Sequence, residues 1–166
     1  MTKTKMITRM SILVTIALLL GYVESLFPPI VPIPGIKLGL ANAVVILLLY
    51  TCSWKTTSTV SILRVILSTT LFGSVTSFLY SLSGAVVSLF IMGIAKKTKL
   101  FSIAGVSSIG GIFHNIAQIT CAYFFVGKGA LLYIPILCVS GAVCGALTGI
   151  AAQLIIKRGR NLFGKE

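Results

Sequence analysis

The organisation of the chain is set by residues 28–50, which read PPIVPIPGIKLGLANAVVILLLY. The first seven residues of this stretch include four prolines, and each proline lacks a backbone N–H and fixes φ, so a regular helix cannot form there. We expect an apolar helix to begin near Leu38, with Lys37 at its entrance and Asn42 one turn inside. A stiff loop followed by a lysine and an asparagine at the start of an apolar helix is the first indication of a binding site.

The composition is that of a membrane protein. The chain has 166 residues, of which 57% are hydrophobic and 10% charged, and its mean hydropathy is +1.08. A soluble domain of this size could not bury so much apolar surface, whereas long apolar runs are typical of transmembrane helices. We therefore predict an all-α protein that forms a single integral membrane domain over residues 1–166. Its six transmembrane helices are expected at residues 10–27, 38–51, 57–72, 78–95, 103–126 and 131–156.

The basic residues are distributed unevenly between the predicted loops. If the N-terminus lies inside, eleven of the fourteen lysines and arginines fall in cytoplasmic segments, and the external loops hold only Lys37 and Lys128. Cytoplasmic loops retain the excess of positive charge, so both termini are predicted inside and the proline loop, residues 28–37, outside. The same rule explains the net charge of +12, so we expect contacts with membrane lipid and no nucleic-acid partner.

Acidic residues are nearly absent, which excludes several kinds of catalysis. The chain contains Glu24 and Glu166 and no aspartate. Mg²⁺ is normally held by carboxylates, so metal-dependent phosphoryl or prenyl transfer by this chain alone is not expected. A P-loop sequence is also lacking, and His114 is the sole histidine, with no serine or cysteine in a recognisable base motif. We expect no enzyme activity of its own, no metal and no cofactor.

Polar side chains within the apolar segments indicate a pocket. Each ionisable or amide group in hydrocarbon is costly and must be paired or face a cavity. Seven such residues fall at the midplane or in the outer half of the predicted bundle, which predicts one pocket facing outward. They are Glu24, Lys37, Asn42, Arg64, His114, Asn115 and Gln118.

The charges of this set favour an anionic ligand. Lys37 and Arg64 outnumber Glu24, and the start of the second helix adds a positive dipole end with unpaired N–H groups. Arg64 is suited to hold a carboxylate or phosphate at two points. The alternative is structural: Glu24 and Arg64 form an intramembrane ion pair, and His114, Asn115 and Gln118 form an interhelical hydrogen-bond cluster.

Small residues mark a packing face in the sixth segment. Gly141, Gly145 and Gly149 are spaced four residues apart, so they lie on one side of a helix and allow another helix to approach closely. We expect this face to pack within the chain rather than in a dimer.

Three sequence blocks resemble one family. They are PPxxPxPGIKLGLAN at residues 28–42, LRVILS at 63–68 and HNxxQ at 114–118. The chain resembles, over about residues 8–156, the Gx transporter family, also labelled heptaprenyl diphosphate synthase component I. That family is similar to the S components of energy-coupling-factor (ECF) transporters, which implies six helices, an outward pocket and no ATPase in the same chain.

The resemblance also implies a lid. In S components the loop between the first two helices covers the ligand, which here assigns the lid to Pro28, Pro29, Pro32, Pro34 and Gly35. One feature departs from that pattern. The first helix of S components carries an alanine motif that docks the coupling subunit, and here that helix has only scattered small residues: Ser11, Thr15, Ala17 and Gly21.

Two functions follow from the resemblance. The first is the substrate-binding component of an uptake system in the bacterial cytoplasmic membrane, which binds a vitamin-, quinone- or isoprenoid-like molecule and works with an ECF-type coupling subunit and ATPases. Lys37 and Arg64 would then hold the anionic group and Glu24 would orient Arg64 or bind an amine, while the amides and His114 would contact other polar atoms. The alternative is a noncatalytic membrane accessory subunit in polyprenyl diphosphate or menaquinone synthesis, with a prenyl synthase partner, or in quinone-linked extracellular electron transfer.

Overall fold

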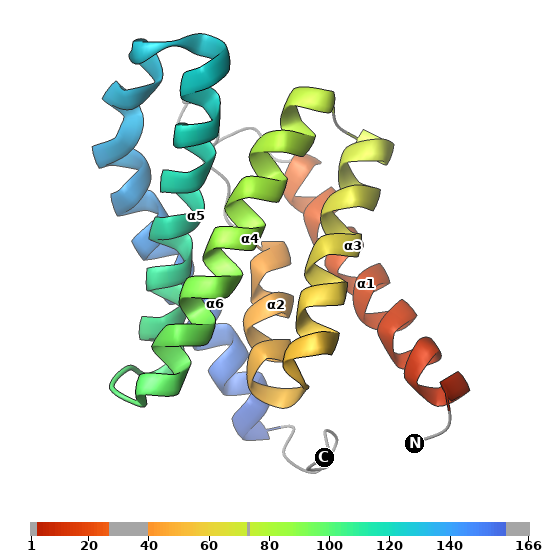
Figure 1. Ribbon diagram of the computed structural model, residues 1–166. Helices are drawn as coiled ribbons and strands as arrows, with labels where there is room; N and C mark the ends of the chain where they lie inside the picture. The colour runs from red at the N-terminus through yellow and green to blue at the C-terminus, as the bar shows by residue number, and fades with distance from the viewer. Residues whose placement is uncertain (1–2, 27–39, 73, 159–166) are drawn as a thin grey trace.

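The computed structural model describes residues 3–26, 40–72 and 74–158 (Figure 1). These ranges contain six α-helices and one short 3₁₀ helix, and no strand occurs within them. The prediction of an all-α chain is therefore confirmed. The helices are α1 (Lys3–Leu26), α2 (Leu40–Thr51), α3 (Trp54–Phe72), α4 (Val75–Thr98), α5 (Ile103–Val126), η1 (Lys128–Tyr133) and α6 (Ile134–Arg158).

Capping residues set the ends of α4 and the start of α5, and α4 extends three residues beyond its apolar segment, residues 78–95, at each end. Ser74 precedes α4 and accepts a hydrogen bond from the Ser77 backbone N–H at 3.2 Å, and Ser102 plays the same part for α5. Serine is favoured here because its oxygen pairs one of the free N–H groups of the first turn. At the other end of α4, Lys99 adopts the left-handed conformation with φ 57° and closes the helix. Hydropathy marks the part of a helix that suits lipid, whereas the cap marks where the helix ends.

Among the described residues, three segments are long and apolar enough to cross a membrane, which indicates a membrane protein. They are Val75–Thr98, Ile103–Val126 and Lys128–Arg158, the last of which joins η1 and α6. The 12 residues of α2 span only about 18 Å, short of the ~30 Å hydrocarbon core. The number of spans and their orientation therefore stay predictions.

The six α-helices form a closed ring. Neighbouring helices contact one another in the order α1, α3, α4, α5, α6, α2 and back to α1, as can be followed in Figure 1. We call the end where α3 stops and α4 begins the α3–α4 end, and the opposite end, where α4 stops and α5 begins, the α4–α5 end. The helix α6 also begins at the α3–α4 end, whereas the shorter α2 begins about halfway along the bundle, and both run toward the α4–α5 end.

The interior of the ring is closed at the α4–α5 end by an apolar cluster. It is contributed by four helices near the point where each reaches this end: α2, α4, α5 and α6. Its buried members are Val45, Ile46, Leu49, Leu89, Met92, Ala95, Val106 and Ala152. In a membrane such side chains stabilise the bundle mainly through van der Waals packing, because the lipid tails outside are as apolar as they are.

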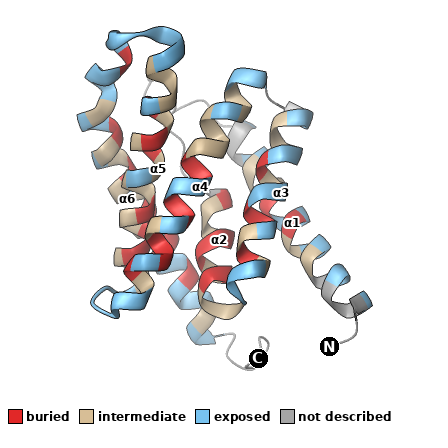
Figure 2. Ribbon diagram, in the orientation of Figure 1, coloured by how far each residue is buried: buried red, intermediate tan, exposed pale blue. Residues whose placement is uncertain are grey.

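Many large apolar side chains are exposed. Figure 2 shows the exposed positions along the outer sides of the helices. On α4 they recur every four residues, with Phe90 61% exposed between Val86 and Ile94. Exposed apolar rows of this kind would be unfavourable in water and are suited to contact with lipid tails.

Glycines of α6 lie directly against α5. A Cβ atom added at Gly145 would come within 2.5 Å of the Ser107 carbonyl oxygen, and one at Gly149 within 2.6 Å of the Ala104 Cα atom. Gly141 meets the backbone of Gly111 in the same way. The two helices therefore touch backbone to backbone, which a larger side chain would prevent.

Candidate functional site

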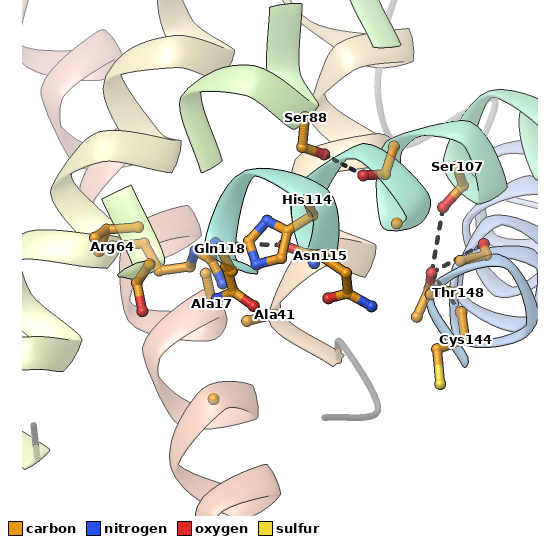
Figure 3. Close-up of a pocket in the computed structure, with 18 of the residues that line it drawn as sticks. Ala17, Ala41, Arg64, Ser88, Ser107, His114, Asn115, Gln118, Cys144 and Thr148 are labelled. Carbon is orange, nitrogen blue, oxygen red and sulfur yellow. Dashed lines mark hydrogen bonds between the residues drawn. The ribbon is translucent and has the colours of Figure 1, made fainter. Parts of the chain in front are cut away.

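A cavity of about 220 Å³ lies inside the ring, and all six α-helices contribute to its wall (Figure 3). Two small residues of α1, Ala17 and Gly21, form one side of it. Because they carry little or no side chain, they leave room for the longer polar groups that come from α3 and α5.

The charged group of the cavity is Arg64, near the middle of α3. It is half-buried, and its Nη2 donates a hydrogen bond to the Oδ1 atom of Asn42 at 3.3 Å. Asn42 lies in the first turn of α2, so the N-terminal end of that helix also faces the cavity. The guanidinium and the helix N-terminus both favour negative charge, so this part of the wall suits an anion.

His114 and Gln118 lie one turn apart on α5 and face α4 at Gly84. A Cβ atom at Gly84 would lie 2.7 Å from the His114 Cε1 atom and 3.0 Å from the Gln118 Cγ atom. The imidazole therefore occupies the space that any side chain at this position of α4 would need. Figure 3 shows His114 and Gln118 between Arg64 on one side and Ser107 on the other.

Asn115 has a structural contact of its own. It is 9% exposed, and its Nδ2 donates a hydrogen bond to the Leu137 carbonyl oxygen of α6 at 2.6 Å. This bond joins α5 to α6 beside the close contact at Gly141. Asn115 lines the cavity, but part of its amide is already used inside the protein.

Hydroxyl groups make up a share of the wall that sequence reasoning missed. Ser68 and Thr69 of α3 and Ser77 and Ser81 of α4 line the cavity toward the α3–α4 end. Serine and threonine are easily accommodated in apolar helices because they bond to their own backbone, as Thr69 does with the Val65 carbonyl oxygen at 2.7 Å. Ser77, Ser81 and, further along α4, Ser88 lie on one face of the helix. This spacing was the signal in the sequence that could have revealed the hydroxyls of the wall.

Several predicted site residues cannot be placed. The predicted lid residues Pro28, Pro29, Pro32, Pro34 and Gly35 lie outside the described residues, as does Lys37. Glu24 belongs to the last turn of α1, but its side chain is not among those described. The lid and the two suggested roles of Glu24 therefore stay predictions.

The described wall offers donors rather than anionic groups. Its polar side chains are one guanidinium, three amides, one imidazole and several hydroxyls, and no carboxylate occurs among the described lining residues. Over the same described part of the chain, no three His, Cys, Asp or Glu side chains lie close enough together to hold a metal ion. Such a wall can bind an anion or a polar head through hydrogen bonds.

A family model described as heptaprenyl diphosphate synthase component I matches residues 13–155. This range includes every described residue that lines the cavity, from Ala17 to Thr148. No curated protein and no solved structure matches the chain significantly.

Proposed function

The chain belongs to the heptaprenyl diphosphate synthase component I family, and from this premise we propose that it is a noncatalytic membrane protein that binds a small molecule with an anionic head. The observation that carries the proposal is the position of Arg64, hydrogen-bonded to Asn42 on the wall of an internal cavity. A guanidinium inside an apolar bundle is costly, so residues of this kind are usually functional.

The chemistry of the wall supports an anion over a cation. Around Arg64 the polar groups are hydroxyls and amides that can donate hydrogen bonds to carboxylate or phosphate oxygens. The first turn of α2 adds backbone N–H groups and a positive dipole end. A cationic ligand would meet the like charge of Arg64 without a described carboxylate to compensate it.

In its finer form the proposal is substrate binding for uptake, as in ECF S components. The apolar cluster at the α4–α5 end closes the cavity there, which supports access from the α3–α4 end. The loop-charge count predicts that this end faces outward. The proline loop, residues 28–37, joins α1 to α2 in the sequence and would then cover the ligand.

The surface of α1 bears on which partner could be coupled. Ala17 is fully buried, and the outward side of the helix carries Ile12, Ile16 and Leu19, which are 54%, 43% and 57% exposed. This surface, which also carries the exposed Ser11 and Thr15, differs from the alanine motif expected of S components. A transport partner would have to dock on a surface of different shape.

A second candidate is an accessory subunit of a prenyl diphosphate synthase. The family description supports it, and a diphosphate head is an anion that Arg64 and the hydroxyls could hold. The chain contains no aspartate to bind Mg²⁺, so the transfer reaction would belong to the partner subunit.

Ligand retention tests the shared part of both proposals. The protein would be purified in lipid nanodiscs and the small molecules that remain bound identified by mass spectrometry. We expect a retained anionic or phosphate-headed molecule that is lost in Arg64→Gln and kept in Lys128→Gln, a control that removes an exposed cation away from the cavity. Retention of the same molecule by Arg64→Gln would refute the anion site.

Capture of partners from membranes separates the two candidates. A tagged chain that brings down ATPases and a transmembrane coupling subunit supports uptake. A chain that brings down a prenyl synthase subunit supports the accessory role and argues against uptake.

A further inference from the structure

We infer that the ligand carries, besides the anionic group held by Arg64, an amide-like group that is bound by Gln118 and Ser81. An amide-like group means here an uncharged group that presents a hydrogen-bond donor and an acceptor side by side. The inference rests on the proposed anion site and adds the chemistry of the other end of the ligand. It follows from two polar side chains of the wall that the rest of the described chain leaves unused.

The side chain of Gln118 lines the cavity without a hydrogen-bond partner in the protein. It is half-buried, and it forms no hydrogen bond with any described residue. The other two amides of the wall are engaged, Asn42 with Arg64 and Asn115 with the Leu137 carbonyl oxygen. A carboxamide has two donor hydrogens and one acceptor oxygen, so Gln118 keeps its full hydrogen-bonding capacity for a ligand.

Ser81 supplies an unused hydroxyl on α4. Hydroxyls in a helix can bond to a carbonyl oxygen of the preceding turn, as Ser68 and Thr69 of the same wall do with that of Val65, at 3.1 and 2.7 Å. Ser81 lines the cavity but forms no hydrogen bond within the described part of the chain. Its hydroxyl is therefore able to donate to a ligand and to accept from it.

Gln118 and Ser81 lie on the same side of the contact between α4 and α5. A Cβ atom at Gly84 would lie 3.0 Å from the Gln118 Cγ atom. Ser81 precedes Gly84 by three residues, so it is on the same face of α4, one turn nearer the α3–α4 end. Gln118 is likewise one turn nearer that end than His114. One group of a ligand can therefore contact both side chains.

The anionic and the amide-like ends would be bound by different helices near mid-length of the cavity. Arg64 comes from the middle of α3, and Figure 3 shows Arg64, Gln118 and His114 in the same part of the cavity. Among the described lining residues Arg64 carries the sole permanent charge, so the end of the ligand at α4 and α5 should be uncharged. A cavity of about 220 Å³ is smaller than the ~300–1,000 Å³ typical of sites for drug-sized ligands, which indicates a compact molecule.

The test uses three carboxylates of nearly the same shape that differ at the far end. Succinamate ends in an amide, levulinate in a methyl ketone that can only accept a hydrogen bond, and isocaproate in an isopropyl group that does neither. Their flexible chains let the two ends adjust to the separation of the two sites. Affinities would be measured by thermal-shift titration of the full chain in nanodiscs. Succinamate should bind at least about fivefold tighter than either of the others.

Two variants assign this preference to the wall. Gln118→Met removes the amide and keeps the length of the side chain, so the preference for succinamate should fall below about twofold. Ser81→Ala should weaken it in the same direction. In both variants the affinity for methyl phosphate, which has an anionic group and no amide-like end, should stay unchanged. If Gln118→Met does not fold, Ser81→Ala and the wild-type series still decide the question.

A matched control exists on α6. Gln153 is exposed and does not line the cavity, so Gln153→Met makes the same chemical change elsewhere. This variant should keep both the preference for succinamate and the affinity for methyl phosphate.

The outcomes separate the two levels of the proposal. If succinamate binds no tighter than levulinate while Arg64→Gln abolishes the binding of both, the amide-like group is overturned and the anion site stands. A preference for succinamate that survives unchanged in Gln118→Met and in Ser81→Ala also overturns the inference. Failure of all three carboxylates and of methyl phosphate to bind the wild type overturns the proposed anion site and this inference with it.

Discussion

Replacing Gly84 by alanine tests how α4 accommodates His114. The added Cβ atom would lie 2.7 Å from the His114 Cε1 atom and 2.9 Å from its Nδ1 atom. Carbon contacts are favourable near 3.5–4.0 Å, so the imidazole would have to move by about 1 Å. Overpacking of this kind costs about 1–3 kcal/mol, and the displaced ring would also enter the cavity. We expect a lower unfolding temperature together with weaker ligand binding.

The effect should depend on His114 itself. In the double variant Gly84→Ala with His114→Ala the contact with the ring is removed, so the second substitution should recover part of the stability lost in the first. A double-mutant cycle of thermal unfolding in nanodiscs measures this coupling, which we expect to be about 1 kcal/mol or more. Gly129→Ala is the matched control, because a Cβ atom there meets nothing within 4 Å and the substitution should be nearly neutral. Additive effects of the two substitutions would refute the described position of the imidazole.

Three further substitutions test the helix packing and the proposed anion site. Gly145→Ala places a Cβ atom 2.5 Å from a backbone oxygen of α5, which cannot move aside as a side chain can. The free energy of unfolding should therefore fall by about 2 kcal/mol or more. An unchanged unfolding temperature would contradict the close helix contact. Asn115→Leu removes the hydrogen bond to the Leu137 carbonyl oxygen and should lower the free energy of unfolding by about 1–3 kcal/mol. The measurement is a lower unfolding temperature with and without phosphate. A variant as stable as the wild type would show that the bond is not needed. Arg64→Lys keeps the charge but loses the planar guanidinium, which can donate two parallel hydrogen bonds to one phosphate. Methyl phosphate should therefore bind about tenfold more weakly in thermal-shift titrations. Equal affinity would show that only the charge matters.

The positions of the helices were predictable because the apolar segments that suit a membrane can be recognised from local sequence. The apolar segment at 103–126 coincides with α5, and the other five segments each lie on one helix to within a few residues, apart from the N-terminal extension of α1. That extension was missed because its residues, such as Lys3 and Arg9, are polar, and hydropathy does not record a helix that continues past the apolar part. The short length of α2 also follows from local sequence, because the prolines before it limit its apolar run.

The candidate site was predictable in its residue types but not in its pairings. Arg64, His114 and Gln118 could be singled out because polar side chains are costly in hydrocarbon wherever the helix is turned. That Arg64 meets Asn42, and that Gly84 makes room for His114, depends on how the helices are rotated about their axes. The serines and threonines of the wall escaped notice because each can bond to its own helix.

The sequence by itself determined that the chain is helical, that it suits a membrane and that a few costly polar groups lie within it. These properties depend on the composition of each segment and on its distance from the nearest proline or cap. Only the tertiary structure decided that the six helices close into a ring, that a cavity lies within it, and that Asn115 serves a contact with α6 as well as the wall. Each of these depends on backbones that are far apart in sequence approaching one another, and no local pattern specifies that distance.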